Sequence, residues 1–359
     1  MNEQRDIFGV LDYSPLPAFC VREGIIQYAN TAARGLLIET GAEIAPMLLT
    51  GRDDYEAFDT GSLYLSVAVS GCPMDAVVTV CEAGHIFTLD QPAQQGELKA
   101  LSLAARELRT PLSGLMNGLE ELMADEALRE DPTLRAQTAR MNRSLFQLLR
   151  TLSNMSDAGT AASLAHMEMV DMVSLFREIF EKADGYLQKM GQSLEYQVPS
   201  ESLYCLADPR LLERGFYNLL SNSLKNSGPS GQIRATLSRK GRMLHLTVQD
   251  SGDGIGDELL PSVFSRYLRQ PSIEDANQGL GLGMVLIRSA AAAHGGTVLV
   301  TRPPEGGTRI TVALAIRQNT DNLLRSPMLS VDYSAERDHP LLELADCLPA
   351  ECYDLQNLL

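Results

Sequence analysis

The first quarter of the chain alternates apolar and polar positions in short runs, separated by turn-forming residues. Stretches such as SLYLSVAV and AVVTVCEAGHIFTL show the two-residue period of strands with one buried face. Upstream of them, NTAARGLLIETG has helical spacing, with Asn30 at its start and Gly41 at its end. Residues 1–92 are therefore predicted to form a domain with an antiparallel sheet and one or two small helices.

From residue 97 the apolar period changes to that of long helices. Two apolar seams are spaced alternately by four and three residues, which is the heptad pattern of packed helices. The short polar connection ADEALREDP separates them, so the two helices should be antiparallel neighbours. The first seam is Leu101, Ala105, Leu108, Leu112, Leu115, Leu119 and Leu122, and the second is Leu134, Thr138, Met141, Leu145, Leu148, Leu152 and Met155.

One helical hairpin has a single apolar stripe and little else to cover it. Two copies would bury the stripe in a four-helix bundle. Residues 97–160 are therefore predicted to be a dimerisation domain, with a homodimer interface inside residues 98–157.

The stretch AARELRTPLSGL lies on the first of these helices. In the heptad register, Arg106, Glu107 and Thr110 fall off the seam, on or near the solvent side. Pro111 removes one helical hydrogen bond and should kink the helix just beyond them.

Residues 165–316 alternate helical and strand-like segments. VDMVSLFREIFEKADGYLQKMG and PRLLERGFYNLLSNSLKNS have helical spacing, whereas QIRATLSRKGRMLHLTVQD alternates on both sides of a Lys240-Gly241 turn. We expect a mixed sheet backed by helices, which makes the chain an α+β multidomain protein. The acidic C-terminal tail, residues 317–359, has the pattern of either an amphipathic docking helix or a loose tail, and both stay open.

Composition narrows the classes of partner. A net charge of −16 over 359 residues repels phosphate backbones and anionic lipids, which argues against a nucleic-acid partner. The six cysteines show no CxxC pair and no histidine at zinc-ligand spacing, so we expect free thiols. The N-terminus lacks the pattern of a signal peptide, and no run of about 18 apolar residues follows. A cytoplasmic protein without membrane insertion is expected.

Three stretches of the α/β region carry chemistry that fits one ligand. DSGDGIG follows a predicted strand, so Asp250 lies at a strand end, where a buried carboxylate can accept a hydrogen bond from an exocyclic amine such as that of adenine. GLGLG precedes a helix whose free backbone amides form a phosphate site. Asn218, Asn222 and Lys225 share one helix face, where asparagine can complete the shell of a phosphate-bound Mg²⁺ and lysine can reach phosphate oxygens.

Each stretch alone is common in turns or on solvated helices, but their order is informative. Together they resemble the N, G1 and G2 boxes of the histidine-kinase ATP-binding domain, and VFSRYLR resembles its F box. AARELRTPLSGL resembles the H box of the same family, and the layout of residues 1–92 is similar to a PAS-type sensor domain. The resemblance implies a PAS-like antiparallel sheet domain, a two-helix dimerisation hairpin and an α/β sandwich domain that binds ATP and Mg²⁺.

The resemblance also implies roles for particular residues. Asn222 would coordinate the Mg²⁺ of the nucleotide, Asp250 would read the adenine amine, and residues 257–278 would form a mobile lid. The implied nucleotide-binding residues are Asn218, Asn222, Lys225, Asp250, Gly252, Gly254, Gly256, Phe264, Arg266, Gly279, Gly281 and Gly283.

Arg106 occupies the phosphoacceptor position, where the H-box pattern has histidine. A neutral imidazole offers a lone pair, whereas a guanidinium is protonated and has no acceptor site. Deprotonating it with Glu107 as the base would be uphill by an amount on the order of 11 kcal/mol. Autophosphorylation at this position is therefore expected to fail, and an ordinary solvated helix arginine is the alternative role for Arg106.

Three activities stay open for a member of this family. The first is a two-component signalling protein that binds ATP-Mg²⁺ and acts on the receiver domain of a response regulator. In the family the Glu107-x-x-Thr110 pair is associated with regulator phosphatase activity, for which Thr110 could orient the attacking water. The second is a pseudokinase that binds and controls a partner histidine kinase, and the third is a kinase that phosphorylates histidine on a partner chain. A chaperone-type or mismatch-repair-type ATPase is a more distant alternative, because the H-box remnant and the paired heptads argue against it.

Overall fold

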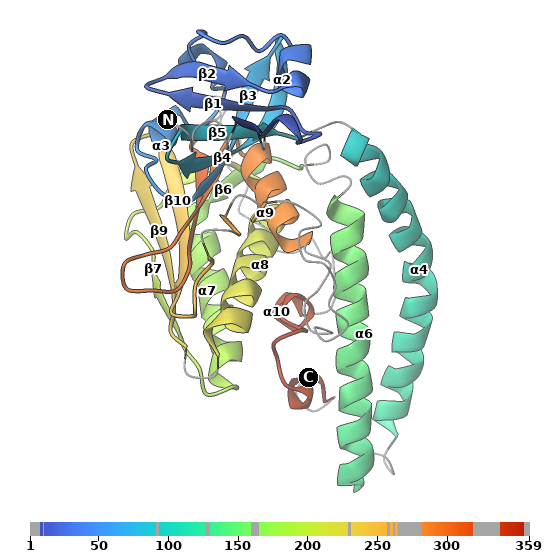
Figure 1. Cartoon of the computed structure of the whole chain (residues 1–359). Helices are drawn as coiled ribbons and strands as arrows, with labels where there is room; N and C mark the ends of the chain where they lie inside the picture. Colours follow the sequence, from blue (N-terminus) through green and yellow to red (C-terminus); the bar gives the residue numbers. More distant parts are fainter. Residues whose placement is uncertain are drawn as a thin grey trace.

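In a computed structural model of the chain, a long helical hairpin stands beside a broad sheet and its covering helices (Figure 1). The described parts of the chain are residues 8–9, 11–90, 93–125, 130–158, 165–228, 231–256, 259–260, 263–264, 282–318 and 338–354. No helix in these ranges combines the length and the apolar character needed to cross a membrane.

The N-terminal region folds as the predicted antiparallel sheet, with strand order β2-β1-β5-β4-β3. Asn30 begins the helix α2 as expected, because its side chain accepts a 2.9 Å hydrogen bond from the backbone N–H of Ala33. The predicted end at Gly41 is wrong: α2 ends at Gly35, and Leu37 has a φ of +64°, which a continuing helix does not allow. The elements are β1 Ala18–Arg22, β2 Ile25–Ala29, α2 Thr31–Gly35, η1 Ala45–Met47, α3 Arg52–Glu56, β3 Ser62–Val69, β4 Cys72–Cys81 and β5 Gly84–Leu89.

The two heptad segments form the helices α4 (Ala93–Ala124) and α6 (Pro132–Ala158), which pack against each other. The first seam splits into two rows. Ala105, Leu112 and Leu119 are 1%, 6% and 4% exposed, whereas Leu108, Leu115 and Leu122 are 54%, 63% and 55% exposed. On α6 the exposed row is Leu134, Met141 and Leu148. One half of the heptad thus holds the hairpin together, and the other half is an apolar stripe open to solvent.

Helix α4 continues without a break through Pro111. Its ribbon is visibly curved in Figure 1, in keeping with the lost hydrogen bond at the proline. Arg106, Glu107 and Thr110 are all exposed, as the heptad register predicts.

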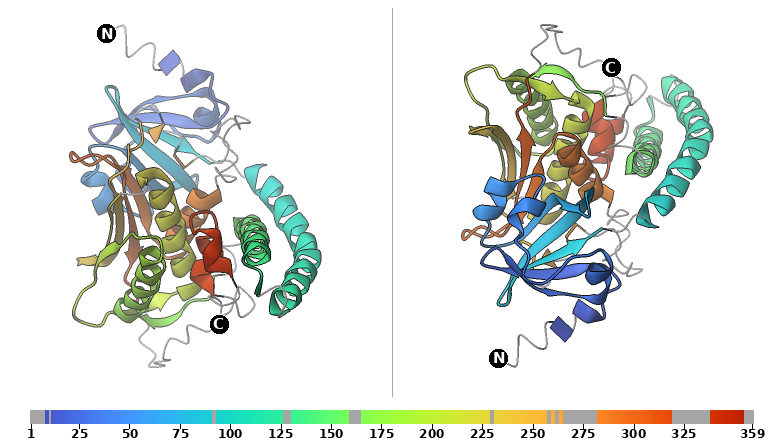
Figure 2. Two further views of the ribbon diagram at one scale, coloured as in Figure 1. Left: turned by 90° about the horizontal axis from the view of Figure 1, so that it is seen from below. Right: turned by 90° about the horizontal axis from the view of Figure 1, so that it is seen from above.

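The C-terminal half has a mixed sheet of order β11-β12-β10-β9-β7, in which β7 is parallel to β9 and the other pairs are antiparallel. Helices α7, α8 and α9 lie on one face of this sheet (Figure 2), and their apolar sides fill the core with residues such as Phe176, Phe216 and Ile287. The elements are β6 Glu168–Asp171, α7 Met172–Gln188, β7 Leu194–Gln197, β8 Tyr204–Ala207, α8 Pro209–Ser227, β9 Ile233–Lys240, β10 Met243–Asp250, α9 Leu282–Ala293, β11 Thr297–Thr301 and β12 Arg309–Ala315.

The two sheets are joined edge to edge. Strand β3 pairs antiparallel with β11, so the described residues of the two regions form one continuous sheet of ten strands. At Gly61 a Cβ atom would lie 2.1 Å from the Val300 carbonyl oxygen, so this close approach requires glycine. Beside the joint, the Thr297 hydroxyl donates a 2.6 Å hydrogen bond to Asp54, and His245 lies 3.6 Å from the same carboxylate.

The C-terminal segment, which we define as residues 338–354, docks against the helices α6 and α8. It contains the short helix α10 (His339–Glu343) and the 3-10 turn η3 (Ala350–Tyr353). Its apolar side chains, including Leu342 and Tyr353, are fully buried in the main core. Of the two forms left open for the tail, the structure has the docked one in this segment.

Candidate functional site

Helix α8 carries the polar face that the sequence singles out. It begins at a side-chain cap, because Asp208 accepts a hydrogen bond from the Leu211 N–H. Asn218 is 2% exposed and donates its amide to the Arg214 carbonyl at 2.9 Å. Asn222 is half-buried, and its amide lies 3.9 Å from the Met284 sulfur on α9. The asparagines of α8 therefore face the first turns of α9.

The start of α9 closes one side of this face. A Cβ atom at Gly283 would lie 3.1 Å from Asn218 Oδ1, so glycine allows the two helices to approach closely. The helix α9 begins at Leu282, so Gly283 of the GLGLG stretch lies inside the helix and not before it. The first backbone N–H groups of a helix lack partners within the helix, so a helix start beside Asn218 and Asn222 can bind an anion.

Asp250 lies at the end of β10 and is 5% exposed. Its Oδ1 accepts hydrogen bonds from the N–H groups of Gly252 at 3.0 Å and Thr308 at 3.1 Å. Burial raises the pKa of this carboxyl above its ordinary value, although these two bonds and the Ser223 hydroxyl act in the opposite direction. The site thus contains a buried carboxylate with acceptor capacity left for a ligand.

The glycines after Asp250 make room for neighbouring backbone. A Cβ atom at Gly252 would lie 2.3 Å from the Asn226 carbonyl oxygen, and one at Gly254, where φ is +79°, would lie 2.8 Å from the Gly307 carbonyl oxygen. At these two positions, therefore, the absence of a Cβ atom makes room for neighbouring backbone of the protein itself. Gly256 is the last residue of the described loop.

The remaining predicted residues divide into two groups. Phe264 is fully buried, and its ring centroid lies 6.0 Å from that of Tyr64 in the N-terminal sheet, so it belongs to the core in this structure. Arg266, Gly279 and Gly281 lie outside the described residues.

The H-box stretch lies on α4, which is the helix of the hairpin farther from α8. Helix α6 stands between α4 and the C-terminal segment in Figures 1 and 2. Helix α9 nevertheless reaches the hairpin, since Leu101 and Met155 pack against its Leu282, Val285 and Leu286. Arg106 follows Leu101 by roughly one and a half turns of helix. Helix α9 of the C-terminal half of the chain is therefore docked next to the H-box stretch.

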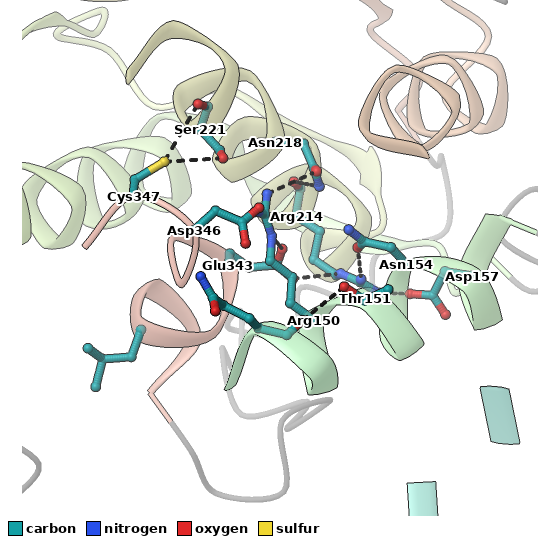
Figure 3. Close-up of polar contacts among 12 residues, drawn as sticks. Arg150, Thr151, Asn154, Asp157, Arg214, Asn218, Ser221, Glu343, Asp346 and Cys347 are labelled. Carbon is teal, nitrogen blue, oxygen red and sulfur yellow. Dashed lines mark hydrogen bonds and ion pairs between the residues drawn. The ribbon is translucent and has the colours of Figure 1, made fainter. Parts of the chain in front are cut away.

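The structure adds a polar cluster that the motif pattern missed (Figure 3). Arg150 of α6 bonds to Asp346 at 2.5 Å, and its other terminal nitrogen lies 3.5 Å from Asn218 Oδ1. Lys225 donates to the same Asp346 oxygen at 2.8 Å. The sequence contains Arg150 in the second heptad helix and an acidic residue within LLELADCL, but no local pattern connects the two.

The geometry of this site agrees with the comparisons with known proteins. Residues 207–318 match the model of the histidine kinase-, DNA gyrase B- and HSP90-like ATPase family. The chain thus contains an ATPase domain of that class, formed by the sheet and helices that carry Asn218, Asn222 and Asp250.

Relatives extend the match beyond this domain. Sensor histidine kinase TmoS of Ectopseudomonas mendocina is 32% identical over 218 residues, which cover 59% of this chain and 22% of TmoS. Signal transduction histidine-protein kinase BaeS of Escherichia coli (strain K12) is 29% identical over 223 residues, which cover 60% of this chain and 46% of BaeS. Both relatives are histidine kinases, and together with the ATPase-domain match they support assignment of the chain to the histidine kinase family. The matched part of the chain spans less than half of the length of either relative.

Among solved structures, full-length ShkA in complex with AMPPNP is similar to this chain. The two are 21% identical with a TM-score of 0.49, and the match covers 62% of this chain and 46% of ShkA.

Proposed function

We propose that the chain binds ATP with Mg²⁺ between α8 and the first turn of α9, and acts on the receiver domain of a response regulator without phosphorylating itself at Arg106. The main support for the nucleotide site is the close contact between Asn218 of α8 and Gly283 of α9, which brings the N-box face next to the first backbone amides of α9. The buried carboxylate of Asp250 is the natural acceptor for the adenine amine.

The residues present fit this nucleotide. Asn222 is half-buried beside α9 and would supply an oxygen to a phosphate-bound Mg²⁺, and Lys225 would supply a positive charge to the phosphates. When bound, Mg²⁺ neutralises phosphate charge. Asp250 fixes the base at the opposite end of the site, since its Oδ1 is already held by two backbone N–H groups.

The regulator-directed chemistry is assigned to the exposed face of α4. Glu107 and Thr110 are one helical turn apart and both exposed, so a partner's phosphorylated aspartate can approach them. The Thr110 hydroxyl would orient a water for attack on the phosphoryl group, a role that needs no histidine. Arg106 beside them would supply a positive charge and no nucleophile.

The exposed stripe of the hairpin supports a homodimer. Leu108, Leu115, Leu122, Met141 and Leu148 are each more than half exposed and recur at heptad spacing, which a second copy of the hairpin would cover. This assembly is the four-helix bundle expected from the sequence.

A pseudokinase that controls a partner kinase is the second candidate. It is favoured by the exposed guanidinium of Arg106 at the phosphoacceptor position, which blocks phosphate transfer to the chain itself.

One experiment separates these activities. Purified protein is incubated with γ-labelled ATP, and separately with phosphorylated receiver domains in the presence of unlabelled ATP. We expect nucleotide binding, no acid-labile label on the protein, and faster loss of phosphate from one receiver domain. Thr110→Ala is the matched variant, because alanine preserves the helix and removes the hydroxyl. Nucleotide binding without any effect of Thr110→Ala on receiver phosphate would favour the pseudokinase.

A further inference from the structure

The C-terminal segment is held on α6 by polar anchors directed at its backbone. The Asn142 amide donates to the Tyr353 carbonyl at 2.9 Å, and both Arg143 and Gln147 donate to the Ala345 carbonyl at 3.2 Å. Because these bonds come from successive turns of one helix, they define the position of the segment along α6.

A buried ion pair defines the second contact, with α8. Glu343 is 0% exposed, and its carboxylate accepts a 2.9 Å bond from Arg214 Nε (Figure 3). Arg150 of α6 lies 3.8 Å from the other carboxylate oxygen. A carboxylate buried without cations would be strongly unfavourable, so the segment docks where α6 and α8 both present an arginine.

Asp346 brings the segment to the predicted phosphate-binding side chains. Its Oδ2 lies 2.8 Å from Lys225 Nζ and 2.5 Å from Arg150. Burial opposes ionisation of Asp346, but Arg150 and Lys225 outweigh it and hold the pKa of the carboxyl below its ordinary value. Arg150 in turn contacts Asn218. An anionic oxygen of the protein thus sits between two cations next to the N-box face, which is the environment that a phosphate oxygen requires.

We propose that the C-terminal segment is an intramolecular competitor of the nucleotide, in which Asp346 occupies Lys225 and Arg150 until phosphate displaces it. The proposal rests on the ATP site described above. A phosphate bound at Lys225 would be close to the Asp346 carboxylate, and two neighbouring anions repel each other. Nucleotide binding and docking of the segment are therefore coupled, and each weakens the other by the same factor. Arg150, supplied by the hairpin, becomes free to contact phosphate when the segment leaves.

The first test measures ATP-Mg²⁺ affinity by calorimetry on the full chain. Asp346→Asn keeps the shape of the side chain and removes its charge, and should lower the Kd for ATP-Mg²⁺ by about tenfold, since charge-assisted bonds to Lys225 and Arg150 are lost. Glu351→Gln is the matched control, because it removes the same charge from an exposed position of the same segment. Equal Kd values for wild type and Asp346→Asn would overturn the competition.

The second test observes the segment directly. Cys352 is 5% exposed, and burial raises the pKa of its thiol, so alkylation by iodoacetamide should be slow while the segment is docked. Saturating ATP-Mg²⁺ should accelerate alkylation of Cys352 in the wild type, measured by mass spectrometry. Asp346→Asn should accelerate it without nucleotide. Cys205, 3% exposed in the ATPase half, is the internal control and should stay protected.

The outcomes distinguish the two proposals. If the wild type binds ATP-Mg²⁺ and Cys352 stays protected at saturation, the nucleotide site stands and the competition is wrong. If neither the wild type nor Asp346→Asn binds nucleotide, the proposed ATP site is wrong, and the competition is rejected with it.

Discussion

Replacing Asp250 by asparagine separates its role in ATP recognition from its role in folding. In the structure Oδ1 accepts the N–H groups of Gly252 and Thr308, and an asparagine carbonyl oxygen in the same place accepts the same two bonds. The second terminal atom becomes an NH₂ group, which can donate to the Ser223 hydroxyl but cannot accept a hydrogen bond from the adenine amine. The loop should therefore keep its shape while the base loses its acceptor.

Asp250→Asn should weaken ATP binding without lowering the stability of the fold. A hydrogen bond to a charged group contributes about 1.5 to 3 kcal/mol, so the Kd for ATP should rise roughly 10-fold to 150-fold. Burial raises the pKa of Asp250 in the folded protein, so the folded state binds this proton more tightly than the unfolded one. The wild type then gains stability as the pH falls through that raised pKa, and the ionised carboxylate is unfavourable at neutral pH. A neutral asparagine side chain carries no such penalty, so Asp250→Asn should melt no earlier than the wild type at pH 7.

Calorimetric titration with ATP-Mg²⁺ and a thermal melt at pH 7 measure the two effects on the same samples. Asp253→Asn is the matched control, since it removes the same charge from an exposed position of the same loop and should leave both quantities unchanged. Equal ATP affinity in wild type and Asp250→Asn would refute the adenine assignment. A large drop in Tm with the loss of binding would show that the carboxylate is needed for the fold instead.

Three other parts of the molecule can be tested in the same way. Leu115→Glu places a charge on the exposed stripe of α4 and should convert a dimer into a folded monomer in light scattering, whereas a monomeric wild type would contradict the four-helix bundle. Arg106→His restores an imidazole on the exposed face and should gain a small amount of acid-labile, alkali-stable label from γ-labelled ATP; such label on the wild type would rule out the scheme. Burial raises the pKa of Asp54, but His245 and Thr297 outweigh burial and hold the pKa below its ordinary value. The ionised carboxylate of Asp54 therefore stabilises the junction of the two sheets above about pH 4, and this stabilisation is lost as the pH falls further. Asp54→Asn should therefore lower Tm at pH 7, with a difference that shrinks in acid, and a constant difference would contradict the role of the carboxylate.

The periodic parts of the fold could be predicted because apolar spacing reports burial directly. The hairpin of β9 and β10 shows this well: Gly241 supplies the positive φ of +57° at the turn, and the flanking alternation defines which face is buried. The heptads likewise identify the helical hairpin. The heptads do not show which row of α4 faces α6, because Ala105 and Leu108 are both apolar. Only the packing in the structure distinguishes them: Ala105 is 1% exposed and Leu108 is 54% exposed.

The joint between the two sheets had no such signal. The alternation within β3 predicts a strand with one buried face, but its pairing with β11 depends on residues more than two hundred positions away. The small residue at Gly61 that permits the approach to Val300 has the ordinary appearance of a turn glycine in sequence. The buried position of Phe264 could not be predicted either, because its contact with Tyr64 depends on the pairing of the two sheets and not on the local sequence pattern.

At the candidate site, the residue types could be predicted from the sequence, but their partners in the fold could not. The spacing of Asn218, Asn222 and Lys225 identifies a polar helix face, because residues three and four apart lie side by side. The spacing says nothing about which anion meets that face, and Asp346 meets it in this structure through Lys225. An acidic residue in an apolar run such as LLELADCL is unfavourable unless cations are supplied from elsewhere, and Arg150 supplies one from a helix almost two hundred residues earlier. A partly buried acid in a C-terminal segment, such as Asp346, thus indicates a cation-rich partner within the fold. When that cation also belongs to a predicted phosphate site, competition between the two anions is the physical consequence.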